Sequence, residues 1–239
     1  MKNKESVMKV DLEALLYMRA QIYFLLSRAF ERELDKDFFE QLTDYAKLLS
    51  DIAKNSEDEA FIVGTNKLNN FISTLRNISF DTALEELACN FATLFLNAAA
   101  HTEVKHIYPY ASVYLSENHL LYQKETEEVI KFYAQNKIAL KKDFKEPEDH
   151  IAVELNFIAL LTDSALNAFK NKNIDLAVNK ISITKGFMEN HLLPWVHKLC
   201  IDLREDSTDD FYKALADITL GYIRTDYKSL DTLIDMLKQ

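Results

Sequence analysis

The stretch that decides the fold runs from residue 146 to residue 169 and reads EPEDHIAVELNFIALLTDSALNAF. Residues of one face recur in it at steps of three and four: Ile151, Leu155, Ile158, Thr162, Ala165 and Phe169. This spacing predicts one amphipathic helix over 147–169. Pro147 is expected to open the helix, because a proline in the first turn gives up only a donor that has no partner there. Glu146, Glu148 and Asp149 would place negative charge at the positive end of the helix dipole.

The composition of the whole chain points the same way. It holds 3 Gly and 3 Pro in 239 residues, whereas average usage of roughly 7% and 5% would give about 29. Sandwiches, barrels and nucleotide-binding α/β sheets need many turn-forming residues, so the composition argues against them. Hydrophobic residues make up 48% of the chain, which is enough for a sizeable core. We therefore predict an all-α, bundle-like fold of about nine to ten helices over residues 1–239.

Hydrophobic spacing divides the chain into helices with short connections. The expected helices cover residues 12–30, 35–54, 57–77, 81–97, 118–136, 147–169, 173–188, 190–205, 209–222 and 227–238. Asp81 and Asn190 are the expected N-caps of two of them. Residues 98–116 lack a sustained period, which predicts a connecting loop with a binding role between an N-terminal part (about 8–97) and a C-terminal part (117–239). This loop could act as a hinge, so one domain, two subdomains, a monomer and a domain-swapped dimer all stay open.

Charge and cysteine content restrict the class of partner and the compartment. Lys and Arg number 28 against 38 Asp and Glu, a net charge of −10, and no basic stripe is present for nucleic acid. An acidic protein attracts basic partners instead. Cys89 and Cys200 both fall in apolar helical patterns and are expected to be reduced packing residues. No run of about 18 apolar residues occurs, so we expect a cytoplasmic protein without a membrane span.

Motifs for catalysis and metal binding are sparse. Gly-x-Ser-x-Gly and phosphate-loop patterns are absent, and Glu103-x-x-His106 occurs once where a di-iron bundle needs two such motifs. The sequence therefore predicts no metal, no cofactor and no enzymatic activity. A helical metal-dependent enzyme that uses His150, Glu154, His101 or His106 is the rival hypothesis from another class.

Four polar or aromatic positions stand out within the helical patterns. Glu154 follows His150 by four residues, which predicts that both lie on one helix face. That face is about 100° around from the apolar stripe, at the rim of a groove, where the pair would form an acid/base dyad or a plain salt bridge. Arg19 interrupts an apolar face, so its head is expected to reach an acid on a neighbouring helix. Trp195, next to Pro194, is expected in the core.

Four blocks of sequence carry a resemblance to a known family. They are Leu94-Phe95-Leu96, the run from Pro109 to Tyr114, the run from Glu146 to Ile151 with Glu154, and the run from His191 to Trp195 together with residues 211–215. In this order, and with the Asp149-His150 pair as the most specific match, they resemble the TorD/DmsD family of cytoplasmic redox-enzyme maturation chaperones. The resemblance is clear over residues 84–222 and covers 12–80 only in helical pattern. Tyr110 and Tyr114 stand where relatives often have tryptophan, and Asn97 replaces a Gly-Pro type of turn.

The resemblance implies a TorD-like, all-α chaperone that is not an enzyme. It would bind the twin-arginine signal peptide and the apo form of a molybdenum-cofactor oxidoreductase of the dimethyl sulfoxide reductase class, until cofactor insertion and Tat export. Such a signal is basic and then apolar, so its receptor needs acids beside an apolar groove. The peptide-binding residues implied are Asp149, His150, Glu148, Glu154, Phe95, Tyr110 and Tyr114. The alternatives are a NarJ-like assembly chaperone for a non-exported molybdoenzyme and a plain helical scaffold.

Overall fold

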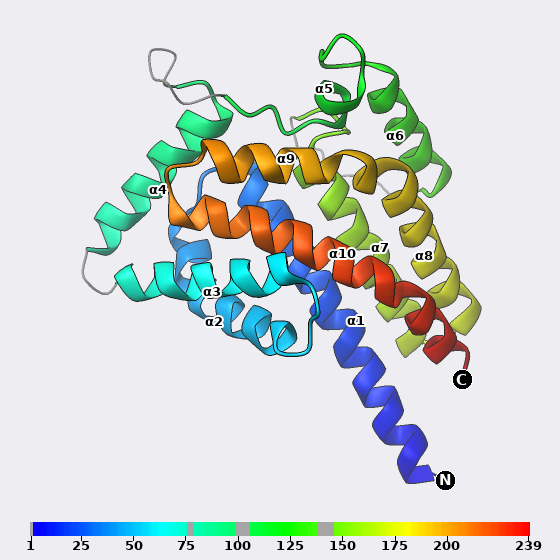
Figure 1. The fold of residues 1–239 in the computed structure, drawn as a ribbon. Helices are drawn as coiled ribbons and strands as arrows, with labels where there is room; N and C mark the ends of the chain where they lie inside the picture. The colour runs from blue at the N-terminus through cyan, green and yellow to red at the C-terminus, as the bar shows by residue number, and fades with distance from the viewer. Residues whose placement is uncertain (1, 76–78, 99–105, 138–145) are drawn as a thin grey trace.

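The chain folds into a bundle of α-helices that surround helix α7. In this computed structural model the described residues are 2–75, 79–98, 106–137 and 146–239, with side chains described from residue 12 onward. Within these ranges the helices are α1 (Lys2–Glu31), α2 (Lys36–Ala53), α3 (Glu59–Thr74), α4 (Phe80–Phe95), α5 (Ala111–Leu115), α6 (Lys124–Gln135), α7 (Ile151–Lys170), α8 (Ile174–Phe187), α9 (Leu193–Asp206) and α10 (Asp210–Lys238) (Figure 1). The predicted all-α class is confirmed.

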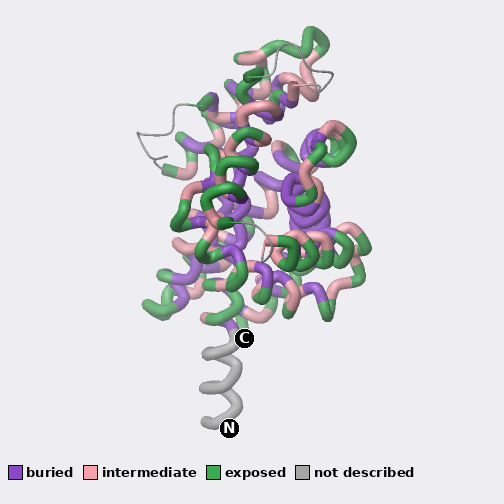
Figure 2. Tube along the Cα trace, turned by 90° about the vertical axis from the view of Figure 1, so that its left-hand side faces the viewer, coloured by how far each residue is buried: buried purple, intermediate pink, exposed green. Residues whose placement is uncertain are grey.

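Helix α7 lies deepest in the bundle. Every residue from 151 to 159 is buried, and the helix packs against α1 and α8, while α10 packs against α3 and α9. By length and composition α7 could also cross a membrane, but 78% of its apolar window is buried inside the bundle. A helix that is apolar all round is a core helix, so the single stripe predicted for it understates its burial. Figure 2 shows the buried positions gathered in the interior and the exposed ones on the outer faces.

Side-chain caps set the start of several helices. Asp35, Asp58 and Asp209 each accept a hydrogen bond from a backbone N–H in the first turn of α2, α3 and α10. The N-cap of α4 is Ser79, whose side chain accepts from the Thr82 N–H, so the prediction of Asp81 as the cap is wrong. Asp81 lies in the first turn instead, where its charge complements the helix dipole.

The predicted helix start at Asn190 is also wrong. A π-helical turn, Met188–Leu192, joins α8 directly to α9, and the Asn190 side chain donates to the Gly186 carbonyl. Pro194 provides the physical reason, since it has no N–H and its ring collides with the carbonyl four residues back in a regular α-helix. A wider π turn placed just before it lets the chain stay helical.

The two helices predicted over 209–222 and 227–238 form the single helix α10. No proline or glycine interrupts residues 222–227, and Asp226 lies inside the bundle as the ion-pair partner of Arg19. The prediction that Arg19 reaches an acid on a neighbouring helix is therefore confirmed, as is the burial of Trp195. Of the two cysteines, Cys200 is buried as predicted, whereas Cys89 lies on the exposed face of α4 and is not a packing residue.

The region around residues 98–151 departs most from the sequence prediction. Helix α5 lies within the expected loop, while residues 99–105, with His101 and Glu103, fall outside the described residues. The helix expected from 118 begins only at Lys124, because His119 and Tyr122 have φ values of 52° and 58°, in the left-handed region that an α-helix excludes. Helix α7 begins at Ile151 instead of Pro147, since the backbone before it pairs with residues 109–111.

Candidate functional site

Asp149 and His150 tie α5 to the beginning of α7. The Ala111 N–H donates to the Asp149 carbonyl at 3.0 Å, the Ile151 N–H donates to the Pro109 carbonyl at 2.9 Å, and Tyr110 and His150 form an isolated β-bridge. In addition, Oδ2 of Asp149 accepts from the Ser112 N–H at 2.8 Å, inside α5. Asp149 is 0% exposed, so its carboxyl group is not in contact with solvent. Through the hydrogen bond from Ser112 it holds α5 in place.

His150 is the N-cap of α7. Its Nδ1 accepts from the Ala152 N–H at 3.1 Å, and the edge of its ring meets Tyr110 with 4.9 Å between the ring centroids. Burial lowers the pKa of His150 to about 3, so the imidazole is neutral, as a capping acceptor must be. Its backbone is extended rather than helical, so His150 and Glu154 are not two positions of one regular helix. Both residues are buried, which makes the predicted place at a groove rim wrong.

Glu154 connects α7 to α9. Its Oε2 accepts from the Trp195 indole N–H at 3.2 Å, and the side chain is completely buried. Burial, and after it the charge of Asp149, raises the pKa of Glu154 well above the usual value. Glu148 is half-buried, and its backbone carbonyl accepts from the Tyr133 hydroxyl on α6 at 3.2 Å.

The two predicted tyrosines extend this network toward the surface. The Tyr110 hydroxyl donates to Oε2 of Glu146 at 2.7 Å. Tyr114 stacks on Trp195, and its hydroxyl donates to Oδ2 of Asp202 at 3.0 Å. Burial, followed by these acids, raises the pKa of both tyrosines, which keeps each hydroxyl a donor.

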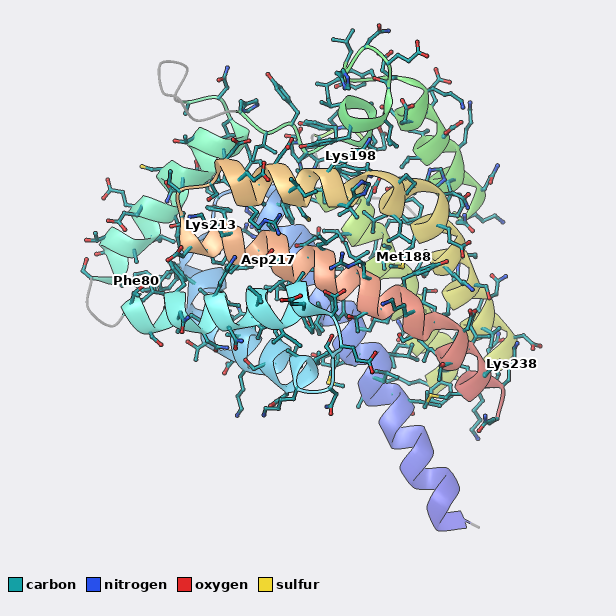
Figure 3. The ribbon with its side chains drawn as sticks, viewed as in Figure 1. Phe80, Met188, Lys198, Lys213, Asp217 and Lys238 are labelled. Carbon is teal, nitrogen blue, oxygen red and sulfur yellow. The ribbon has the colours of Figure 1, made fainter. Side chains whose placement is uncertain are left out.

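A cleft of about 510 Å³ opens beside Tyr114, between the segment 106–119 and α9. It is lined by His106, Tyr108, Val113, Tyr114, His119, Lys198, Ile201 and Asp202. Tyr108 and Ile201 expose 46% and 39% of their surface, so apolar surface is accessible on both walls. Lys198, which lies where α9 passes α5, donates to the Tyr114 carbonyl (Figure 3). Lys198, Ile201 and Asp202 form the wall of the cleft on α9. Their spacing places them on one helix face, but no motif in the sequence indicates that this face lines a cleft.

Phe95 is packed in a different way from the other predicted residues. Its ring contacts Phe91, Phe30 and Tyr212 with centroids 5.0–6.2 Å apart, whereas Leu96 beside it is 58% exposed. The Ile107 N–H donates to the Leu94 carbonyl at 2.8 Å, which brings the end of α4 next to the segment that leads to Tyr110.

Asn97 turns the chain directly after this block. Its φ of 53° is left-handed, a conformation that asparagine tolerates better than most residues. The Asn97 N–H donates to Nδ1 of His106 at 3.1 Å. Asparagine can therefore form this turn, for which the family resemblance implies a Gly-Pro type.

The described residues of the metal-enzyme hypothesis, His106, His150 and Glu154, do not form a ligand set. Among the residues that the structure describes, no group of three or more His, Cys, Asp or Glu is placed to hold a metal ion. His106 and His150 each use Nδ1 to accept a backbone N–H, while His101 lies outside the described residues. What the arrangement offers is an open cleft with aromatic side chains on its 106–119 wall, next to the hydrogen-bonded junction of α5, α7 and α9.

Comparison with known proteins places the chain among chaperones. Residues 54–201 match the family described as nitrate reductase delta subunit. The chaperone protein TorD of Shewanella sp. (strain ANA-3) is 30% identical over 219 residues, which is 90% of this chain and 95% of the relative. The TorD proteins of Psychrobacter sp. (strain PRwf-1) and Vibrio atlanticus (strain LGP32) are 30% and 28% identical, over 91% and 92% of this chain and 93% and 98% of theirs. By this family match and by its identity to TorD proteins over most of both chains, the chain belongs to the TorD family of chaperones, within the nitrate reductase delta subunit group.

Proposed function

We propose that this protein is a cytoplasmic, non-enzymatic chaperone for a molybdenum-cofactor oxidoreductase of the dimethyl sulfoxide reductase class. It binds the twin-arginine signal peptide and the apo form of that enzyme until the cofactor is inserted, before Tat export. The observation that carries the proposal is the cleft between residues 106–119 and α9, with apolar surface from Tyr108 and Ile201 on its walls. Relatives named as chaperones support the general role.

Charge on the segments around the cleft suits a basic peptide. Segments 106–123, 146–149 and 193–206 contain Glu117, Glu146, Glu148, Asp149, Asp202, Glu205 and Asp206 against Lys198 and Arg204. A peptide that is basic and then apolar would find acids beside exposed aromatic and aliphatic side chains. In this arrangement the buried residues Asp149, His150 and Glu154 support the cleft, and Phe95 supports its α4 side. Tyr114 lies in the cleft wall, and Tyr110 and Glu148 lie on the segments beside it.

Calorimetric titration with twin-arginine signal peptides of molybdoenzymes, at low and moderate salt, tests the proposal. We expect salt-sensitive binding that weakens when the Arg pair of the peptide is replaced by neutral residues. Tyr108→Ser and Ile201→Ser should weaken binding, and Tyr17→Ser is the matched control, because Tyr17 is 55% exposed on α1 and does not line the cleft. Equal affinity in all three variants would contradict the location of the site.

The buried motif has its own test. Asp149→Ala and His150→Ala should weaken peptide binding through α5 while the helical content survives, and unchanged affinity in both would remove them from the site. Binding that does not depend on the Arg pair would favour a NarJ-like role on a non-exported molybdoenzyme. No binding to any such peptide would favour a plain scaffold.

A further inference from the structure

Asp149 and Glu154 flank the N-cap of α7 at two positions that are often paired in helices. With His150 as the N-cap, Asp149 is the residue before the cap and Glu154 is the fourth residue of the helix. Side chains at these positions often pack together across the first turn, and when both are apolar the contact is known as the hydrophobic staple. Here both are carboxyl groups, and both residues are 0% exposed.

In each of these carboxyl groups, one oxygen accepts a hydrogen bond and the other has no hydrogen-bond partner in the part of the chain that the structure describes. Oδ2 of Asp149 accepts from the Ser112 N–H, and Oε2 of Glu154 accepts from the Trp195 indole. Oδ1 of Asp149 and Oε1 of Glu154 are buried without a hydrogen-bond partner among the described residues. Buried polar atoms are almost always hydrogen-bonded. Two buried oxygens without a hydrogen-bond partner, on the residue before the N-cap and on the fourth residue of the same helix, therefore need an explanation.

We propose that Asp149 and Glu154 share a single proton, with Oε1–H of Glu154 donating to Oδ1 of Asp149. Two ionised carboxylates cannot stay side by side in a buried site, because desolvation and mutual repulsion both oppose the second charge. One proton between the two groups leaves only one negative charge, so the repulsion disappears. It also forms a hydrogen bond between Oδ1 of Asp149 and Oε1 of Glu154, the two oxygens that otherwise lack one. The proton resides on Glu154, whose pKa is raised by burial and then by Asp149.

Among the described residues, the groups that face the pair supply no compensating positive charge. Tyr133 faces it from α6, and the pKa of this tyrosine is raised by burial and then by Glu154, Asp149 and Glu148. Ser112 faces it from α5 and Trp195 from α9, and both are uncharged. His150, between the two acids in sequence, is neutral because burial lowers its pKa to about 3.

The shared proton fixes both walls of the peptide cleft. Asp149 holds α5 through Ser112, and Glu154 holds α9 through Trp195, whose ring stacks on Tyr114 in the cleft wall. Loss of the proton to solvent leaves two negative charges at the junction and drives α5 and α9 apart. Glu154 is thus a positioning residue for peptide binding, and this last consequence rests on the proposed function.

Unfolding as a function of pH tests the shared proton without any peptide. Between the ordinary pKa of glutamate and the raised value, the folded state holds one proton more than the unfolded chain. The unfolding constant of the wild type therefore rises about tenfold per pH unit in that interval, relative to Glu154→Gln, which keeps a donor to Asp149 but cannot titrate. Glu148→Gln is the matched control, with the same side-chain substitution outside the pair, and it should keep the wild-type slope.

Infrared spectroscopy of the folded wild type gives a second test that needs no variant to fold. At neutral pH the spectrum should contain the C=O stretching band of one protonated carboxylic acid, and this band should vanish on alkaline titration. Emission from Trp195, the only tryptophan, should change over the same pH interval in the wild type and in Glu148→Gln, but not in Glu154→Gln.

The results of these experiments distinguish failure of the shared-proton proposal from failure of the proposed function. Equal pH slopes in wild type and Glu154→Gln, or no acid band at neutral pH, would overturn the shared proton. Peptide affinity should fall over the same pH interval in the wild type and stay constant in Glu154→Gln. If no signal peptide binds at any pH, the proposed function fails. The unfolding and infrared results still show whether Asp149 and Glu154 share a proton.

Discussion

Arg19 and Asp226, 207 residues apart, form a bidentate ion pair inside the bundle, with Nε–Oδ1 and Nη2–Oδ2 distances of 2.7 and 2.9 Å. The Tyr23 hydroxyl also donates to Asp226, and the guanidinium donates to Thr162 on α7. One buried carboxylate thus joins the first helix to the last, and the guanidinium adds the central helix. This network meets α7 at Thr162, near the middle of the helix and away from Asp149 and His150 at its start.

Removal of one partner of this pair should strongly destabilise the fold. We expect Asp226→Ala to lower the free energy of unfolding by about 3–5 kcal/mol, because it leaves a buried guanidinium unpaired. The double variant Arg19→Met with Asp226→Leu should recover most of this loss, since apolar residues of similar volume replace the pair. Urea unfolding of the three proteins measures both effects. A loss below about 1 kcal/mol in Asp226→Ala would contradict the buried pairing.

Close contact between α3 and α10 depends on two glycines. A methyl group on Gly64 would lie 2.6 Å from the Ile218 backbone N, and one on Gly221 would collide with the Phe61 backbone. Gly64→Ala and Gly221→Ala should each lower the melting temperature, because backbone atoms would have to move. Gly186→Ala is the control, since nothing lies within 4 Å of its added methyl. That substitution should stabilise α8 by about 0.5–1 kcal/mol, and a loss there would be unexpected.

Stability should fall in mildly acidic solution because of His150. Its pKa is about 3 in the folded protein, so between that value and its ordinary 6.5 only the unfolded chain binds the proton. The contribution of His150 is complete above pH of about 6.5 and is lost as the pH falls toward 3. His150→Asn keeps a capping acceptor but does not titrate, so its unfolding free energy should depend less on pH in this interval. Parallel curves for the two proteins would show that His150 is charged in the fold.

Phe95 and Leu96 should respond in opposite ways to truncation. Phe95→Ala should cost about 3–5 kcal/mol of stability, because the ring lies in a cluster with Phe91 and Tyr212. Leu96→Ser should change stability by less than about 0.5 kcal/mol, since the side chain is 58% exposed. If the end of α4 borders the peptide site, Leu96→Ser lowers peptide affinity. Thermal unfolding and calorimetry of the same samples distinguish the two roles.

Much of the fold follows from the sequence alone. The near absence of glycine and proline and the three-and-four spacing of apolar residues give the all-α class and most helix ranges, because a helix must bury one face wherever it packs. The same local reasoning places Arg19 against an acid and Trp195 in the core. It fails where long-range contacts compete with local signals: residues 147–150 look like a helix start, but their backbone pairs with residues 109–111.

The site itself was only partly visible in the sequence. The motif resemblance named Asp149, His150 and Tyr114, yet only the tertiary structure shows that the first two are buried supports and that α9 forms the second wall of the cleft. Sequence spacing describes one helix at a time. Whether a carboxyl group faces solvent or is buried, as those of Asp149 and Glu154 are, depends on which helices cover it, and this is decided by packing between segments far apart in the chain.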